Sequence, residues 1–174
     1  MEIFFCKERV GAQQIQQVLK PLRQSSSQVF LGQGLYTLGL LGWILEQTGQ
    51  ADIAVTTFST SDAFLSGVIN LRKRGLINHS TLLADIKASS KTLKLKRLMT
   101  EAFDDVRLTL NHSKMMLVSN AEWLVSVITS QNQTYGDRAE CTFISLDRDV
   151  YLDIHYMLNN LLDDKKTISI PRRE

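Results

Sequence analysis

The densest group of residues able to do chemistry lies between Asn111 and Glu140 and opens with His112-Ser113-Lys114. Side chains of an extended chain alternate between its two faces, so His112 and Lys114 are predicted to project from the same face. A neutral imidazole beside an ammonium can attack phosphorus while the cation holds the phosphate oxygens, and this chemistry needs no metal ion. The spacing therefore indicates a nucleophilic site for a phosphate ester.

Further polar residues follow after two apolar runs, Met115–Val118 and Leu124–Ile128, which predict a hairpin. Ser130 and Asn132 also share a face in an extended chain, and both can donate hydrogen bonds to phosphate oxygens. Glu140 stands eight residues beyond Asn132. A carboxylate next to an imidazole fixes its tautomer and supports the developing imidazolium, so Glu140 is predicted to serve His112.

Each of these residues also has an ordinary interpretation. A lone His112 is typical of a partly buried strand histidine, and Lys114 of a solvated lysine. Ser130 and Asn132 are typical turn formers, and Glu140 is a typical ion-pair partner. The argument for chemistry therefore depends on the order and spacing of all five.

Together the five residues resemble the motif of the phospholipase D superfamily, which is His-x-Lys, a hairpin, Gly-Ser-x-Asn and a later Glu. Thr129-Ser130-Gln131-Asn132 matches the second part with Thr in place of Gly. The run from Asn132 to Glu140 resembles the Asn-Leu-Thr-x-Asn-x-Arg-x-Glu run of bacterial members. The specific match covers about thirty residues, and the order of predicted elements suits one lobe of that fold.

The resemblance implies a role for each residue. His112, Lys114 and Glu140 would be catalytic, and Lys114, Ser130 and Asn132 would bind phosphate, with no metal and no cofactor. In the mechanism of the family, one histidine attacks phosphorus and forms a phosphohistidine. A second histidine protonates the leaving oxygen and then activates water.

This mechanism uses two motifs, and the chain carries one. Neither His79 nor His155 has a lysine two residues later, and His155 is predicted to be a core or capped histidine of the last helix. The resemblance therefore implies a homodimer in which the two copies of His112 face each other across a two-fold axis.

The chain departs from the family motif at one position, where Ser119 replaces an Asp five residues after Lys114. Two interpretations stay open. The first is a metal-independent phosphodiesterase, a nuclease acting on DNA or RNA. The second is a catalytically silent nucleic-acid-binding module with the same fold. A third hypothesis, an interaction domain with a coincidental motif, predicts that His112 lies far from Lys114, Asn132 and Glu140.

Apolar periodicity and β-branched runs predict the elements that must position these residues. Helices are predicted at residues 12–22, 35–48, 62–74, 89–103 and 149–162. Strands are predicted at residues 3–5, 29–31, 52–58, 80–86, 106–110, 115–118, 124–128 and 141–146. This alternation predicts an α/β fold, a phospholipase D-like single lobe with a mixed sheet sandwiched by helices. Residues 1–162 are predicted to form that domain, and residues 163–174 a charged, frayed C-terminal tail.

The composition is that of an ordinary globular protein. The 174 residues include 20 Lys and Arg against 18 Asp and Glu, a net charge of +2, with 44% apolar residues. Two Pro and nine Gly exclude collagen-like chains. The small net charge still allows a nucleic-acid partner, DNA above all, because the distribution of charge matters more than its sum. Three basic clusters are either solvated helix faces or a track for a phosphate backbone: Arg72–Arg74, Lys91–Arg97 and Lys165–Arg173.

The remaining features point to a reducing, aqueous setting. Cys6 and Cys141 fit no metal or redox spacing and are predicted to be free thiols, although a disulfide is an alternative. The longest apolar stretch, Leu35–Leu45, has about half the length of a membrane span. The N-terminus has no signal-peptide pattern. We therefore expect a cytoplasmic protein without a membrane partner.

Overall fold

A computed structural model describes residues 2–5, 14–87 and 93–171. These residues form one nine-stranded sheet with the order β1-β2-β8-β7-β6-β3-β4-β5-β9. The strands are β1 (Glu2–Phe5), β2 (Ser27–Gly32), β3 (Ala51–Thr57), β4 (Ile77–Asp85), β5 (Asp105–Thr109), β6 (Met115–Ser119), β7 (Leu124–Thr129), β8 (Glu140–Ser145) and β9 (Ile168–Ser169).

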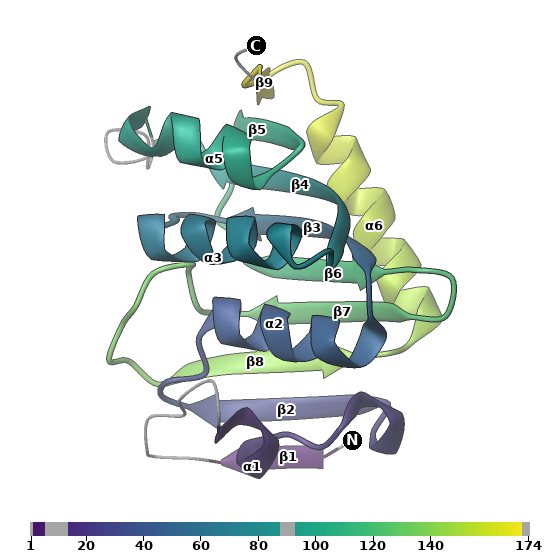
Figure 1. Ribbon diagram of the computed structural model, residues 1–174. Helices are drawn as coiled ribbons and strands as arrows, with labels where there is room; N and C mark the ends of the chain where they lie inside the picture. Colours follow the sequence, from purple (N-terminus) through teal and green to yellow (C-terminus); the bar gives the residue numbers. More distant parts are fainter. Residues whose placement is uncertain (1, 6–13, 88–92, 172–174) are drawn as a thin grey trace.

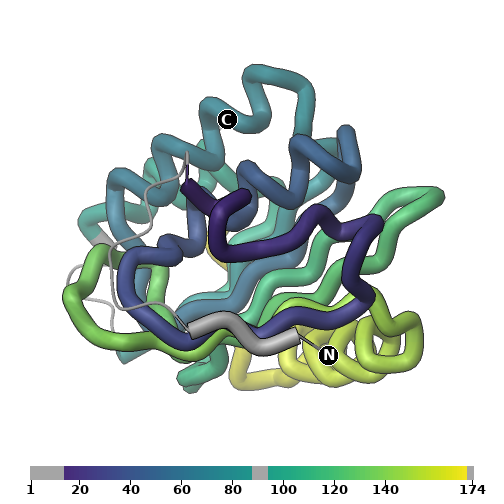
Figure 2. The backbone as a smooth tube through the Cα atoms, turned by 90° about the horizontal axis from the view of Figure 1, so that it is seen from below, coloured from purple at the N-terminus to yellow at the C-terminus, as the bar shows by residue number. Residues whose placement is uncertain are grey.

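Helices cover both faces of this sheet, so the predicted sandwich is confirmed (Figures 1 and 2). The helical elements are α1 (Ile15–Val18), η2 (Leu22–Gln24), α2 (Thr37–Thr48), α3 (Asp62–Lys73), η3 (Leu93–Leu95), α5 (Lys96–Ala102) and α6 (Arg148–Leu162). Helix α6 crosses one face alone, whereas α1, α2, α3 and α5 lie on the other (Figure 1).

The sheet is mixed, as the sequence predicts. Strands β3, β4 and β5 run parallel, with α3 and α5 in the connections between them. Strands β6, β7 and β8 form an antiparallel meander that joins β3 through β6. The ends of β3, β4 and β5 therefore lie at the same edge as the start of β6, the end of β7 and the start of β8. These strand ends together form the carboxyl edge of the sheet, on the left in Figure 1.

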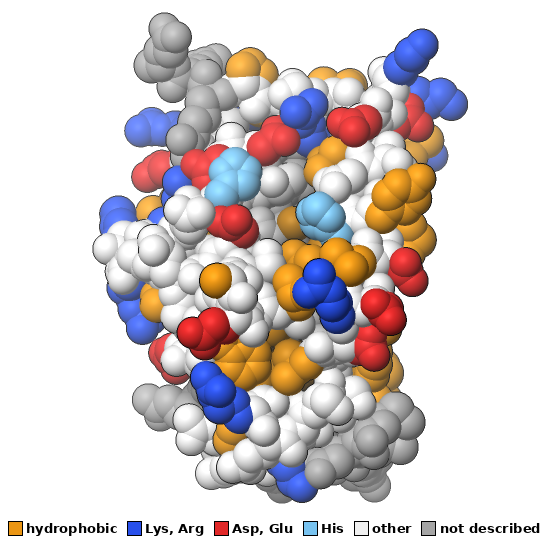
Figure 3. Space-filling view, turned by 90° about the vertical axis from the view of Figure 1, so that its right-hand side faces the viewer, with side chains coloured by type: hydrophobic (Ala, Val, Ile, Leu, Met, Phe, Trp, Pro, Cys, Tyr) orange, Lys and Arg blue, Asp and Glu red, His pale blue; other side chains and the backbone are white. Residues whose placement is uncertain are grey.

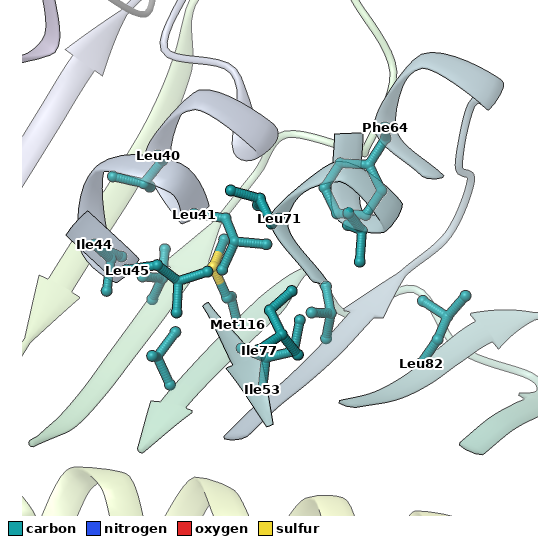
Figure 4. Packing of buried hydrophobic residues seen from close by; sticks show 14 of the residues in the cluster. Leu40, Leu41, Ile44, Leu45, Ile53, Phe64, Leu71, Ile77, Leu82 and Met116 are labelled. Atoms are coloured by element: carbon teal, nitrogen blue, oxygen red, sulfur yellow. The ribbon is translucent and has the colours of Figure 1, made fainter. Parts of the chain in front are cut away.

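The main core lies between α2 and α3 and the middle of the sheet. Leu41, Ile44 and Leu45 of α2 have no exposed surface and point toward Ile53 and Met116 of the strands (Figure 4). Each such buried aliphatic side chain contributes roughly 2 kcal/mol through the hydrophobic effect. The apolar character of α2 on nearly all sides, visible in the sequence, thus reflects its burial.

Local signals set the end of α2 and the start of α3. Gly49 ends α2 with φ of 75°, a left-handed conformation that favours glycine. Ser61 caps α3, because its Oγ accepts a hydrogen bond of 3.2 Å from the Phe64 N–H. The same hydroxyl donates to the Gln133 carbonyl at 2.8 Å. The start of α3 is therefore tied to the segment that follows β7.

Three segments differ from the prediction. In the helix predicted at 12–22, residues 12 and 13 lie outside the described residues, and only Ile15–Val18 is α-helical. Pro21, which lacks an N–H, separates it from the 3-10 turn η2. In the helix predicted at 89–103, residues 89–92 lie outside the described part, and α5 begins only at Lys96.

The tail is the third difference, since its residues Ile168–Ser169 are not frayed. They pair with β5 as β9, and Ile170 donates its N–H to the Val106 carbonyl at 2.9 Å. The side chain of Ile170 is buried against the core. Strand β9 thus covers the backbone of β5, which would otherwise be an open sheet edge. A separate unit at residues 163–174 stays a prediction.

An ion pair holds the crossover connections at the edge opposite the carboxyl edge. Arg72, in the last turn of α3, donates two hydrogen bonds to the carboxylate of Asp104, of 2.7 and 2.8 Å. Ser80 of β4 donates to the same carboxylate through its N–H and its hydroxyl, both at 2.9 Å. The hydrogen bonds from Arg72 hold the pKa of Asp104 well below its usual range, despite partial burial.

We predict that Arg72→Met lowers the free energy of unfolding by about 2 kcal/mol at pH 7, because it removes the cation that pairs with a partly buried carboxylate. Asp104 has a lowered pKa in the folded state, so its contribution is present above about pH 4 and is lost as the pH falls. Urea unfolding from pH 7 to pH 3 should therefore show that the difference in the free energy of unfolding between wild type and Asp104→Asn becomes smaller in acid. Arg74→Met, which alters an exposed pair with Glu46, is the control. A difference that stays constant with pH would contradict the assignment.

Candidate active site

The connection between β5 and β6 lies at the carboxyl edge and is anchored by Asn111. The Asn111 side chain is 5% exposed. Its Nδ2 donates to the carbonyls of Thr57 and Leu83, at 3.2 and 3.4 Å, and its backbone N–H donates to Asp85 Oδ2 at 2.8 Å. One buried asparagine thus ties this connection to the ends of β3 and β4.

Ser113 turns inward and completes the anchor. Its N–H donates to Asn111 Oδ1 at 3.1 Å, and its Oγ lies 2.5 Å from that oxygen and 2.9 Å from Thr56 Oγ1. Thr56 Oγ1 in turn accepts a hydrogen bond from the Met115 N–H at 3.0 Å. Because Ser113 points into the protein, its neighbours His112 and Lys114 point outward.

The side chains of His112 and Lys114 meet, as their spacing predicts. Lys114 Nζ donates to the carbonyl oxygen of His112 at 2.9 Å and lies 3.4 Å from His112 Nδ1. The imidazole packs against Phe58, with ring centroids 4.9 Å apart, and the residue remains exposed. An ammonium can only donate, so this contact is a hydrogen bond when Nδ1 carries no proton. The arrangement gives an accessible imidazole with a cation beside it.

The second segment lies alongside the first. The Thr129 N–H donates to the Lys114 carbonyl at 3.0 Å, and the Ser130 N–H donates to the Cys141 carbonyl at 2.9 Å. These bonds extend the ladders of β6 with β7 and of β7 with β8 past the strand ends. The residues before β6, after β7 and at the start of β8 are therefore neighbours at the carboxyl edge. This placement disfavours the hypothesis of a coincidental motif.

Glu140 contacts Ser130 across the ends of β7 and β8. Ser130 Oγ donates a short hydrogen bond to Glu140 Oε2 and accepts one of 3.0 Å from the Cys141 N–H. The sequence predicts Glu140 next to the imidazole of His112, whereas in this structure the carboxylate is hydrogen-bonded by Ser130. The cross-strand register accounts for the difference, because it sets the start of β8 against the end of β7.

Asn132 lies where the chain leaves β7 and meets the start of α3. The next residue, Gln133, donates its N–H to the Ser59 carbonyl at 3.2 Å and forms a bridge with Thr60. Asn132 itself is half-buried, and its Oδ1 is a buried atom without a hydrogen-bond partner in the described part of the chain. The amide is thus uncommitted, and its NH2 group can donate to an anion.

Ser119, the position where the motif departs from the family, lies far from His112. Strand β6 runs from Met115 at the carboxyl edge to Ser119 at its other end, a rise of about 13 Å. There Ser119 hydrogen-bonds the hydroxyl of Tyr151 on α6, a group whose pKa is raised above its ordinary value, mainly by burial. The substitution at position 119 therefore removes no group from the neighbourhood of His112.

The basic clusters divide between the two edges. Lys87 follows β4, and Lys94, Lys96 and Arg97 lie exposed in the segment that follows, so these cations belong to the carboxyl edge. The cluster Arg72–Arg74 ends α3 at the opposite edge, where charges of both signs are interspersed (Figure 3). Arg72 is moreover committed to Asp104. These positions disfavour a phosphate track through Arg72–Arg74, and the segment after β4 and the exposed Lys165 and Lys166 remain candidates.

Metal-ligating groups, membrane-spanning helices and thiols are the other candidates for ligand chemistry in the described residues. No group of three His, Cys, Asp or Glu side chains there could hold a metal ion. None of the described helices is long and apolar enough to cross a membrane. Cys141 is a free, exposed cysteine, and Cys6 lies outside the described residues. His155 is exposed on α6 and stacks on Tyr151 at 5.9 Å, so it is not a core residue.

Comparison with solved structures identifies the fold. Polyphosphate kinase from Porphyromonas gingivalis superposes with a TM-score of 0.63 at 14% identity, over 90% of this chain and 29% of the kinase. NucT from Helicobacter pylori superposes with a TM-score of 0.58 at 10% identity, over 79% of this chain and 95% of NucT. Phosphatidylserine synthase from Haemophilus influenzae Rd KW20 gives 0.56 at 14% identity, over 82% of this chain and 39% of the synthase.

The chain has the phospholipase D-like fold. The three solved proteins belong to the phospholipase D superfamily. No family model matches the sequence, and no curated protein matches it. The chain spans less than a third of the polyphosphate kinase but nearly all of NucT.

We predict that Asn111→Ala lowers the free energy of unfolding by roughly 2 kcal/mol, because it removes the hydrogen bonds of Asn111 to buried carbonyls and to the Ser113 N–H. Denaturant unfolding measures the change. Asn70→Ala, at an exposed position of α3, is the matched control and should change stability by less than about 0.5 kcal/mol. Equal effects of the two substitutions would contradict the anchoring role of Asn111.

Proposed function

We propose that this protein is a metal-independent phosphodiesterase of the phospholipase D superfamily, a nuclease acting on DNA or RNA. The observation that carries the proposal is the contact between His112 and Lys114 on the outer side of an anchored connection. Ser130, Asn132 and Glu140 lie at the same edge of the phospholipase D-like sheet, in the order that the motif requires.

His112 is assigned as the nucleophile, and Lys114, Ser130 and Asn132 as ligands of the phosphate oxygens. Attack by Nε2 requires the ring proton on Nδ1, so Lys114 has to leave Nδ1 and turn to the phosphate when substrate binds. Glu140 is the carboxylate proposed to accept a hydrogen bond from the Nδ1–H, in exchange for its bond with Ser130. The anionic phosphate is a stronger hydrogen-bond acceptor for Lys114 than His112 Nδ1.

The reaction proceeds in two displacements. The Nε2 atom of one His112 bonds to phosphorus while the P–O bond to the leaving group breaks, and a second, protonated histidine gives its proton to that oxygen. Water then bonds to phosphorus and the P–N bond breaks. The proton of that water passes to the second histidine, so both histidines return to their starting states.

A second copy of the chain is proposed to supply the second histidine. His79 lies 3.7 Å from Asp104 at the opposite edge, and His155 lies on the outside of α6. Neither belongs to the carboxyl edge, so within the described chain His112 is the single histidine at the site. A two-fold homodimer would bring the two copies of His112 together.

Nucleic acid is proposed as the substrate because of the exposed cations at the carboxyl edge. Lys87, Lys94 and Lys96 lie in the segment after β4, where they can follow a phosphate backbone. A solved archaeal chromatin protein, TrmBL2, described as showing a novel mode of DNA binding, superposes on 78% of this chain with a TM-score of 0.53 at 13% identity. Its likeness supports DNA binding without cleavage as the alternative function.

We predict cleavage of DNA or RNA in EDTA that falls at least a hundredfold in His112→Ala, because loss of the nucleophile removes the covalent route. The measurement is product formation on a gel from labelled single- and double-stranded substrates. His155→Ala, which alters an exposed histidine elsewhere, is the matched control and should retain wild-type activity. Equal residual cleavage by wild type and His112→Ala would contradict the assignment of His112 as the nucleophile. Salt-dependent binding without cleavage would favour the catalytically silent nucleic-acid-binding module.

The homodimer makes a second, quantitative prediction. When wild type and His112→Ala are unfolded together and refolded as mixtures, activity should fall as the square of the wild-type fraction, because each site needs two histidines. An equal mixture then retains about a quarter of the activity, whereas independent monomers retain about half. A linear loss of activity, or a monomer in sedimentation at assay concentration, would refute the shared site.

A further inference from the structure

A shallow pocket opens beside the proposed active site, between the first turns of α2 and α3. Thr37 and Leu38 of α2, Ser61 and Phe64 of α3, and Gln133 and Tyr135 of the segment after β7 contribute to its wall. Gln133 directly follows Asn132, one of the proposed phosphate ligands. The pocket therefore adjoins Asn132, which is assigned to the reacting phosphate.

Gln133 is the feature of this pocket that its fold does not explain. The residue is 3% exposed, yet neither Nε2 nor Oε1 has a hydrogen-bond partner in the described structure. Five buried side-chain polar atoms lack a partner among the described residues, and four of them belong to Thr60, Asn132 and Gln133. Buried polar groups are nearly always paired, because an unpaired one costs free energy. This concentration of unpaired donors and acceptors indicates a ligand.

Two tyrosines form the rim of the pocket. The rings of Tyr36 and Tyr135 meet edge to face, with centroids 4.4 Å apart and an interplanar angle of 75°. Tyr135 is 64% exposed, so its ring is available to a ligand. Aromatic rings of this kind stack on nucleobases regardless of base identity. The basic clusters in the sequence lack such aromatic residues, so this rim is the natural place for stacking.

The pocket is small and open at its mouth. The empty space within it, open mouth included, is about 220 Å³. A planar ring can enter it by an edge, with an exocyclic amino or keto group foremost. Nucleobases carry such groups on an edge with adjacent donors and acceptors.

We propose that this pocket is a subsite for an unpaired nucleobase next to the reacting phosphate, an inference that rests on the proposed function. The amide of Gln133 hydrogen-bonds the edge of the base, as Gln does when it recognises adenine, and Tyr135 stacks on its ring. Both faces of a base in a duplex are stacked on neighbouring bases, so Tyr135 can stack only on a base outside a duplex. The substrate is therefore single-stranded nucleic acid, or a nucleotide that has left its duplex.

Binding can be tested without catalysis. The side-chain amide of Gln133 is followed by NMR while deoxyadenosine 5′-monophosphate is added, with 2-deoxyribose 5-phosphate as the ligand that lacks the base. We expect saturable shifts of the Gln133 amide with the nucleotide, and at least tenfold weaker binding of the sugar phosphate. Tyr135→Ala should weaken nucleotide binding at least fivefold, while Tyr156→Ala, equally exposed on α6, should not. Equal binding of the two ligands would overturn the subsite.

Kinetics separate the subsite from the catalytic proposal. The p-nitrophenyl diester of deoxyadenosine 5′-monophosphate is compared with the same diester of 2-deoxyribose 5-phosphate. We expect kcat/KM at least tenfold higher for the ester with the base in wild type, and a clearly smaller difference in Gln133→Met, which keeps the shape of the side chain but cannot hydrogen-bond. Gln133→Met should melt no lower than wild type, since it removes an unpaired buried amide.

The outcomes distinguish the two proposals. Cleavage of both esters at equal rates by wild type would overturn the subsite and leave the phosphodiesterase standing. Base-dependent binding by NMR without cleavage of either ester would support the subsite and overturn the phosphodiesterase. An unchanged preference for the base in both Gln133→Met and Tyr135→Ala would also overturn the subsite.

Discussion

The buried amide of Asn111 is the constraint on which the candidate site depends. The connection between β5 and β6 has no regular secondary structure, so no ladder or helix fixes the direction of its side chains. Asn111 replaces that ladder with bonds to the ends of β3 and β4 and to Ser113. Because Ser113 is held inward, His112 and Lys114 have no other direction than outward. Preorganisation of this kind lowers the cost of placing a nucleophile.

The two edges of the sheet differ in how well their polar groups are paired. At one edge, Arg72, Ser80 and Asp104 form a network of mutual hydrogen bonds. At the carboxyl edge, Asn132 and Gln133 keep buried polar atoms unpaired. Unpaired groups of this kind lower stability, and proteins keep them where a ligand can satisfy them. Ser119 belongs to the edge without the candidate site, because it lies at the end of β6 away from His112.

Much of the fold and part of the site could be predicted from the sequence. Periodicity located α2, α3, α6 and the β6–β7 hairpin, and the alternation of side chains predicted that His112 and Lys114 meet. The partner of Glu140 could not be predicted, because it depends on the register of β7 and β8 across an irregular loop. Asn111 and Gln133 were missed because a single buried amide leaves no periodic signal. The ion pair of Arg72 could not be predicted either, since its partner, Asp104, lies 32 residues away.

The central claim is that His112 itself attacks phosphorus, and trapping the covalent intermediate tests it most directly. The protein is mixed with a nucleotide diester labelled with 32P, quenched in alkali within the first turnover, and digested for peptide analysis. Phosphohistidine survives alkali and is hydrolysed in acid. The account predicts one labelled peptide, which contains His112 and loses its label in acid. Product formation without labelled protein, or a label on any other residue, would contradict it.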